Sequence, residues 1–188
     1  MERKMIMIKK DNIELHQIGL DELPQFTTKI QEAFAIAAKE KFGFDEPIPS
    51  TQEVLSSFQK TGSKTYNIIA DGKCVGGAML MIDEKTQHNS LELFFISPEC
   101  HSHGLGLAVW QAIEAKYPDT VVWETITPYF EQRNIHFYVN KCGFHIVEFF
   151  NKYHIDPNIF CPEDANGEMV PGTDAFFRFE KKMTNSSQ

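Results

Sequence analysis

The sequence has no long apolar run, no paired-cysteine motif and no excess of basic residues. No stretch approaches the roughly 20 apolar residues that a transmembrane helix needs. The opening MERKMIMIKK has too few apolar residues for the central region of a secretory signal. Its four cysteines are scattered without a C-x-x-C pair, which favours reduced thiols. We therefore expect a cytoplasmic protein without a membrane partner.

The missing basic charge also excludes a class of function. A net charge of −8 argues against a general nucleic-acid binder, because such proteins need a basic footprint on the phosphate backbone. The 188 residues, 42% of them hydrophobic, suffice for one domain with a real core. We expect a single domain over residues 1–183 and a disordered tail at residues 184–188.

Hydrophobic periodicity predicts a mixed α/β fold. Strands are expected at 12–18, 64–70, 74–82, 90–96, 120–126, 143–150 and 175–183. Helices are expected at 22–42, 52–58, 104–116 and 129–141. Asp71-Gly72 between two strands is a strong hairpin signal, and Thr51 is the expected cap of the second helix. Gly143 is the expected left-handed cap at the end of the last helix.

The segment SPECHSHGLGLAVW, residues 97–110, places Gly104 and Gly106 between a strand and a helix. Glycines at such a point let the backbone approach a ligand closely, very often a phosphate. A P-loop is excluded because no Lys-Ser or Lys-Thr follows Gly106. A dinucleotide fingerprint is excluded because seven residues separate Ile96 from Gly104 and the third glycine is missing.

Extended to FFISPECHSHGLGLAVW, this segment resembles the acyl-coenzyme-A-binding segment of the GCN5-related N-acetyltransferase (GNAT) family. That segment consists of a hydrophobic strand, a proline, [RQ]-x-x-G-x-[GA] and a helix. Pro98, Gly104 and Gly106 match it, whereas His101 stands where Arg or Gln is usual. NIHFYVNKCGF, residues 134–144, resembles the family's later signature, N-x-x-x-x-Y-x-x-x-G-F with variable spacing.

The resemblance implies an α/β (α+β) fold with a mixed, mostly antiparallel central sheet of about seven strands, flanked by about four helices. It also implies an enzyme that transfers the acetyl group of acetyl-CoA to a primary amine, by direct attack in a ternary complex. The expected acceptor is a small molecule.

The resemblance also assigns residues to coenzyme binding. They are Phe94, Phe95, Ile96, His101, Ser102, His103, Gly104, Leu105, Gly106, Asn134 and Tyr138. Backbone N–H groups at the head of the third helix would face the pyrophosphate. Those of the strand at 94–96 would bind the pantetheine arm and the thioester carbonyl. Tyr138 stands at the position of the general acid that protonates the leaving thiolate, and Asn134 lies one turn before it.

Two carboxylates compete for the role of general base toward the amine. Glu92 lies on the same side of its strand as Phe94 and Ile96, because side chains alternate along a strand. Glu124, on the next strand, is its rival, and is otherwise an acceptor-binding candidate together with Tyr129.

Residues 151–174 form a long segment, rich in Pro, Asp, Asn and Gly, between the last two expected strands. Its acidic residues favour a cationic acceptor. They are Asp156, Glu163, Asp164, Glu168 and Asp174. Polyamines, amino acids, aminoglycosides, peptide N-termini and protein lysines all stay open as acceptors. The fold is also compatible with a homodimer.

Two further interpretations compete with that of an enzyme. The CHSH run at 100–103 resembles a metal-ligand sequence, but no second ligand pair at zinc spacing accompanies it, so no metal is expected. The departure at His101 leaves a non-catalytic acyl-CoA-binding or sensor domain of the same fold as the alternative function.

Overall fold

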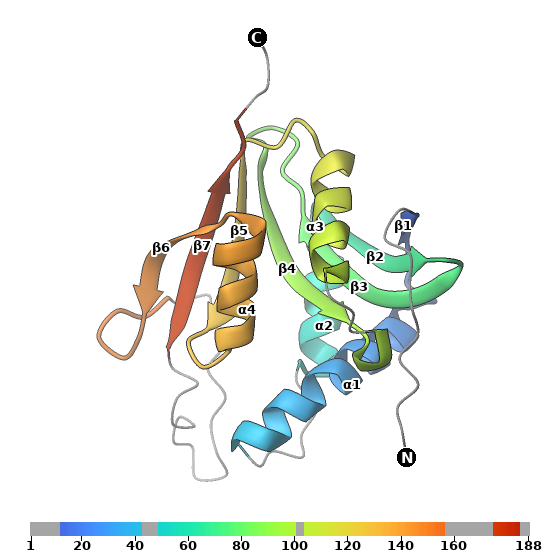
Figure 1. The fold of residues 1–188 in the computed structure, drawn as a ribbon, viewed down its shortest axis with the longest axis horizontal. Helices are drawn as coiled ribbons and strands as arrows, with labels where there is room; N and C mark the ends of the chain where they lie inside the picture. Colours follow the sequence, from blue (N-terminus) through green and yellow to red (C-terminus); the bar gives the residue numbers. More distant parts are fainter. Residues whose placement is uncertain (1–11, 43–48, 101–103, 157–174, 185–188) are drawn as a thin grey trace. The chain divides into compact units, whose positions relative to one another are not determined.

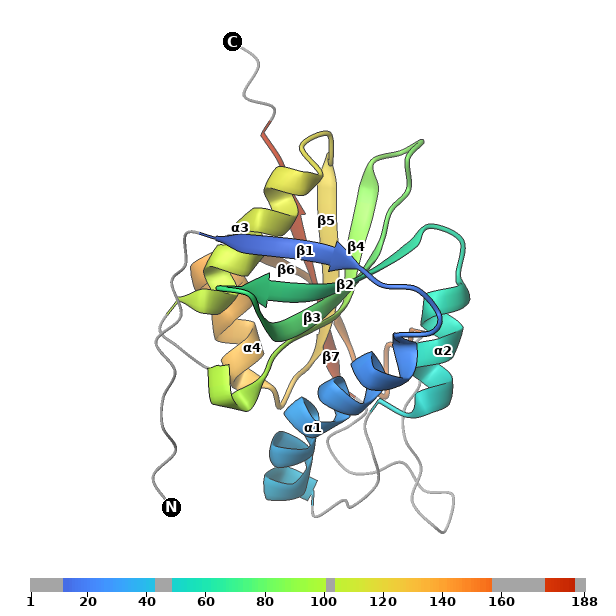
Figure 2. The ribbon, with the colours of Figure 1, turned by 90° about the vertical axis from the view of Figure 1, so that its right-hand side faces the viewer.

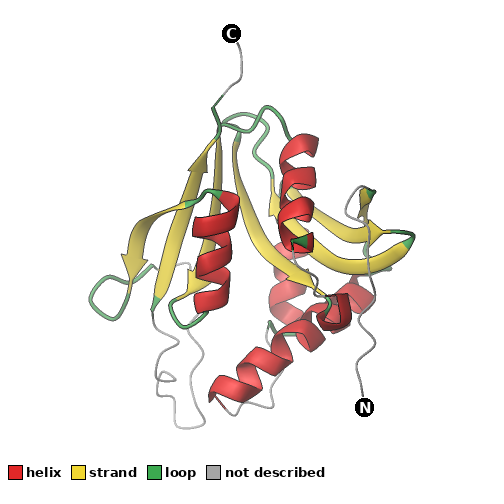
Figure 3. Ribbon diagram, viewed as in Figure 1, coloured by secondary structure: helices red, strands yellow, loops and turns green. Residues whose placement is uncertain are grey.

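A computed structural model describes residues 12–42, 49–100, 104–156 and 175–184 (Figures 1 and 3). The α-helices in these ranges are α1 (Leu23–Phe42), α2 (Thr51–Gln59), α3 (Leu105–Lys116) and α4 (Gln132–His136). Two shorter segments are the 3₁₀ turn η1 (Pro98–Cys100) and the π-helix η2 (Phe137–Cys142). The strands are β1 (Ile13–Gln17), β2 (Ser63–Ala70), β3 (Lys73–Met81), β4 (His88–Ile96), β5 (Val122–Pro128), β6 (His145–Phe150) and β7 (Phe176–Lys182). The mixed α/β class, with seven strands and four α-helices in the described residues, is confirmed.

The chain divides into two units, which are described separately. The first unit comprises Met1–Lys85 and Leu91–Pro118, and the second comprises Thr86–Ser90 and Asp119–Gln188. Among the residues that the structure describes, no helix is both long enough and apolar enough to cross a membrane.

In the first unit, β1, β2, β3 and β4 are neighbours in that order, with β1–β2 and β2–β3 antiparallel. Asp71 and Gly72 join β2 to β3 and both have positive φ, 49° and 73°, as the hairpin prediction requires. The second helix is capped by Ser50, not by Thr51 as expected. Ser50 and Glu53 form a reciprocal capping box, which satisfies two backbone donors at once and therefore fixes the helix start one residue earlier.

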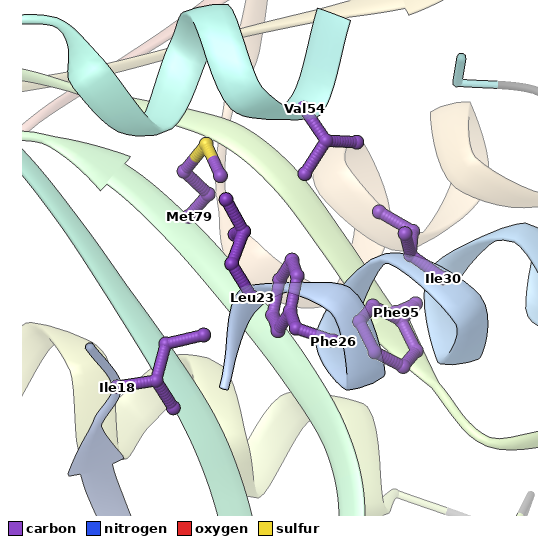
Figure 4. Close-up of a cluster of buried hydrophobic side chains, with 7 residues drawn as sticks. All are labelled: Ile18, Leu23, Phe26, Ile30, Val54, Met79 and Phe95. Atoms are coloured by element: carbon purple, nitrogen blue, oxygen red, sulfur yellow. The ribbon is translucent and has the colours of Figure 1, made fainter. Parts of the chain in front are cut away.

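The core of the first unit lies between α1, α2 and one face of its strands (Figures 2 and 4). Its buried side chains are Ile18, Leu23, Phe26, Ile30, Val54, Met79 and Phe95. Phe26 and Phe95 meet edge to face, with ring centroids 5.5 Å apart. A methyl group on Gly77 would lie 2.4 Å from Phe26 and 2.6 Å from Phe95, so a glycine there lets α1 and β4 pack this closely. This packing holds β4 in place up to the start of the glycine loop.

In the second unit, β7 lies between β5 and β6 and pairs antiparallel with both. Thr125 of β5 lies opposite Phe179 of β7, and Ile126 lies opposite Arg178. Because side chains alternate, Thr125 and Phe179 point to one face and Arg178 points to the other. Phe179 packs against Tyr138, so the first of these faces is the one that α4 and η2 cover (Figure 1).

Candidate functional site

The glycine loop begins where β4 ends. After Ile96, the Ser97 N–H donates to Val75 and the Cys100 N–H donates back to Ser97, both at 2.8 Å, which closes the turn η1. Gly104 then caps α3 with φ 91°, a left-handed conformation that glycine adopts at little cost. His101, Ser102 and His103, three of the predicted coenzyme-binding residues, lie outside the described residues.

The head of α3 has the geometry of an anion site. Gly104 is exposed, Leu105 is buried and anchors the first turn, and Gly106 is half-buried. The first intrahelical hydrogen bond runs from the Ala108 N–H to the Gly104 carbonyl at 3.1 Å. The N–H groups of residues 105–107 belong to the first turn of α3. These N–H groups have no acceptor within the helix, and they carry the positive end of the helix dipole. The glycines leave this end of the helix without bulky side chains.

The side chains of β4 alternate as predicted. Phe95 is buried in the core, whereas Phe94 and Ile96 are half-buried and Glu92 is exposed on the other side of the strand. Any role of Phe95 toward a ligand therefore falls to its backbone, because its ring is engaged with Phe26.

The helix predicted over 129–141 is wrong at its start and in its second half. β5 continues to Pro128, and the Tyr129 N–H donates to Ala175 at 2.8 Å, which extends the β5–β7 pairing. The helix therefore begins only at Gln132. From Phe137 it widens into the π-helix η2 and ends at the left-handed Gly143, as expected, with φ 80°. Asn134 lies in the regular part and is half-buried.

Tyr138 lies in η2 and is 6% exposed. Its ring centroid is 5.4 Å from that of Phe137, 5.6 Å from Phe144 and 5.8 Å from Phe179. Its hydroxyl forms a hydrogen bond with the side chain of Thr125. Burial raises the pKa of the Tyr138 phenol well above its ordinary value, although the hydrogen bond with Thr125 acts in the opposite direction. The phenol therefore keeps its proton at physiological pH.

Glu124 lies on the opposite face of the β5–β7–β6 strands, in a cluster that the sequence analysis missed. Arg178 donates to Glu124 at 3.0 Å, to Glu148 at 3.0 Å and to Glu180 at 2.7 Å. His154 lies 2.8 Å from the second carboxylate oxygen of Glu148. The only sequence signal for the cluster is the alternation of charged and aromatic residues in FFRFEK, which marks one polar face of β7.

We expect Arg178→Gln to change the titration of Glu148. Hydrogen bonds from His154 and Arg178 hold the pKa of Glu148 below its ordinary value, so removal of the guanidinium should raise that pKa. A depressed carboxyl pKa stabilises the fold above the unfolded pKa, and this stabilisation disappears as the pH falls through the folded value. The variant should therefore unfold more easily near pH 7, with a smaller deficit near about pH 3.

An NMR titration of the Glu148 carboxyl and urea unfolding at both pH values measure these effects. Lys182→Gln is the matched control, since Lys182 is an exposed cation on the same strand. An unchanged Glu148 titration in Arg178→Gln would contradict the prediction.

Tyr129 belongs to a separate, partly exposed aromatic cluster. Its ring centroid lies 5.9 Å from that of Phe149 and 5.6 Å from that of Phe177, while those two rings are 5.0 Å apart. Tyr129 is 51% exposed, so it presents an aromatic surface to solvent. Most of the predicted acceptor loop, residues 157–174, lies outside the described residues.

Three comparisons with known proteins bear on this site. The model of the acetyltransferase (GNAT) family matches residues 29–144. An uncharacterized protein of Bacillus subtilis strain 168, YrkN, is 56% identical over 164 residues, which are 86% of this chain and 89% of that protein.

Solved structures show the same fold at low sequence identity. The ribosomal-protein-S18-alanine N-acetyltransferase of Escherichia coli has a TM-score of 0.64 at 13% identity, with 94% of this chain and 99% of that chain covered. A spermidine N-acetyltransferase of Vibrio cholerae, in complex with CoA and spermine, has a TM-score of 0.62 at 12% identity, with 90% and 95% covered. A Bacillus subtilis acetyltransferase in complex with CoA has a TM-score of 0.58 at 17% identity, with 92% and 99% covered.

Proposed function

The chain belongs to the GNAT family of acetyltransferases, and we propose that it transfers the acetyl group of acetyl-CoA to a primary amine of a small cationic acceptor. The observation that carries the proposal is the left-handed Gly104 at the head of α3. The residues present fit a pyrophosphate there, because the first turn of the helix offers N–H donors and the dipole favours negative charge. In a protein of net charge −8, such local dipoles have to hold an anionic coenzyme.

Coenzyme binding would extend from this loop to the end of β4 and to the second signature segment, residues 134–144. Residues 101–106 would hold the pyrophosphate, and the backbone of Phe94, Phe95 and Ile96 would receive the pantetheine arm like an added strand. Asn134 would exchange a hydrogen bond with pantetheine or with the thioester. Acetyl-CoA supplies the activated acyl group and the leaving thiolate.

The acceptor amine has to lose a proton before it attacks. An amine with a pKa of about 10.4 is neutral in about one molecule in 2,500 at pH 7, a cost of about 4.6 kcal/mol. We assign the base role to Glu92, which is exposed on the same side of β4 as Phe94 and Ile96. Glu124 is then left for binding the cationic acceptor.

Tyr138 is the proposed general acid that protonates the departing thiolate. The raised pKa of this buried phenol keeps it protonated when the reaction begins, but it also makes transfer of the proton to the thiolate more costly, so a hydrogen-bond donor to the phenol oxygen has to offset part of that cost. Its ring is fixed on three sides by Phe137, Phe144 and Phe179, so the hydroxyl needs little reorganisation at the moment of reaction.

The acceptor class follows from charge and from exposed aromatic surface. Glu124, Glu148 and Glu180 surround a single guanidinium, so this cluster has an excess of carboxylates and suits a cation. Tyr129, whose cluster with Phe149 and Phe177 lies on the opposite face of these strands, would contact the apolar part or the cation of an acceptor that reaches that face. The spermidine enzyme among the structural neighbours supports a polyamine-like amine as the acceptor. The ribosomal-protein enzyme is the reason to test a peptide N-terminus as an acceptor as well. A cytoplasmic location, without nucleic-acid or membrane partners, is part of the proposal.

Thermal unfolding with acetyl-CoA, followed by an amine screen, tests the proposal. Coenzyme at about 100 times its dissociation constant should stabilise the fold by about 2.7 kcal/mol. For a chain of this size the midpoint should rise by roughly 5–11 °C. Release of the CoA thiol is then measured with polyamines, amino acids, aminoglycosides and peptides. No shift at saturating coenzyme would overturn the proposal. A shift without turnover of any amine would instead favour the acyl-CoA sensor.

A further inference from the structure

Thr125 is a buried polar residue that lies next to the proposed general acid. It belongs to β5 and is 4% exposed. Across the strand pair it lies opposite Phe179, whose ring packs against Tyr138. Strand register and ring packing thus place the Thr125 hydroxyl of β5 next to the Tyr138 phenol in η2.

The aromatic rings around Tyr138 fix the plane of its ring but do not fix the direction of its O–H bond. The phenol O–H rotates about its C–O bond, and apolar rings do not determine where its proton points. A polar neighbour decides this orientation. The hydrogen bond with Thr125 supplies that neighbour, and it does so from a side chain whose own χ1 is restricted by β-branching.

We propose that Thr125 is a positioning residue for Tyr138, an inference that rests on the proposed acetyl transfer. The Thr125 hydroxyl donates to the phenol oxygen, so the phenol proton points away from Thr125 and is available to the leaving thiolate. As Tyr138 gives up its proton, the same donor stabilises the phenolate that forms. The proton goes from the phenol oxygen to the thiolate sulfur, and Thr125 keeps its own.

The energetics favour this direction of the hydrogen bond. A phenolate buried among aromatic rings without a donor would be strongly disfavoured, because burial penalises the charged form. A hydrogen bond to a charged group is stronger than one to a neutral group, so the contact with Thr125 strengthens as the charge develops. The bond also lowers the phenol pKa against the effect of burial.

Single and double variants test the role of Thr125. Thr125→Val keeps the shape and removes the donor, and we expect kcat to fall about tenfold with KM for acetyl-CoA changed less than about twofold. Thr125→Ser restores the donor and should recover most of kcat. In a Tyr138→Phe background, Thr125→Val should change kcat by less than about twofold, because there is no phenol left to position.

Thr127→Val is the matched control. Thr127 is 2% exposed on the same strand and the same face, but lies opposite Phe177 instead of Phe179. Its substitution should leave kcat unchanged, and urea unfolding of both variants shows what each change costs in stability.

Four outcomes would overturn the inference. A Thr125→Val enzyme as active as Thr127→Val would do so, as would an undiminished effect in the Tyr138→Phe background, since both indicate packing alone. Full activity of Tyr138→Phe would refute the general acid and Thr125 with it. Absence of turnover by the wild type would refute the proposed function itself. That outcome differs from the case in which the wild type is active and Thr125→Val has no effect on kcat, which would refute only the role of Thr125.

Discussion

Gly104→Val should weaken acetyl-CoA binding by at least about 100-fold. Gly104 has φ 91°, a region that β-branched residues essentially avoid, so valine would have to shift the backbone at the head of α3. Its methyl groups would also hold a phosphate away from the N–H groups of the first turn. Two lost charge-assisted hydrogen bonds, at about 1.5–3 kcal/mol each, account for this factor. Isothermal titration with acetyl-CoA measures the dissociation constant.

Gly72→Val separates backbone strain from the loss of a binding site. Gly72 has φ 73°, and a Cβ there would meet nothing within 4 Å. It therefore shares the strain of the left-handed conformation but belongs to the turn between β2 and β3, not to the head of α3. We expect this variant to lose stability and to keep the wild-type dissociation constant. If Gly104→Val retained coenzyme affinity within about threefold, the assignment of the phosphate loop would be wrong.

The residues that sequence analysis placed correctly are those whose requirements are local. Gly143 and the Asp71-Gly72 pair have the positive φ that the helix end and the hairpin signal predicted. Gly104, which was predicted only to let the backbone approach a phosphate, also has positive φ. Gly104 is also where coenzyme binding is proposed, so the same local signal indicated both a turn and a site.

What the sequence did not predict depends on strand register. Arg178 contacts Glu148 across 30 residues of chain and Glu124 across 54, and only the β5–β7–β6 order brings the three together. Sequence analysis selected Glu124 for its charge, yet the neighbouring Thr125 is the residue that faces Tyr138, because adjacent side chains on a strand point to opposite faces. The π-helix was also missed, and its Tyr138 ring packs on Phe179 of the last strand, a contact that the local sequence does not specify.

Tyr138→Phe should lower kcat by about 100-fold to 10,000-fold, the usual contribution of a general acid. The ring and its packing against Phe137, Phe144 and Phe179 are preserved, so the acetyl-CoA dissociation constant should change less than about threefold. Because burial raises the pKa of the phenol, the wild-type kcat should not fall between about pH 7 and pH 9 through loss of this proton. Steady-state kinetics over this pH range, together with titration calorimetry, measure both quantities.

Tyr66→Phe is the matched control for the loss of a buried tyrosine hydroxyl. Tyr66 is 2% exposed, and its hydroxyl lies 2.5 Å from that of Tyr117. Removal of the Tyr66 hydroxyl should cost stability, since the half-buried Tyr117 loses a hydrogen bond, but should leave kcat within about twofold. A large loss of kcat in Tyr138→Phe alone then identifies a step in the chemistry, because both variants lose a buried, hydrogen-bonded tyrosine hydroxyl and only Tyr138 has the proposed catalytic role. Equal kcat in both variants would mean that the thiolate takes its proton from another donor, such as solvent, and that Tyr138 serves the core.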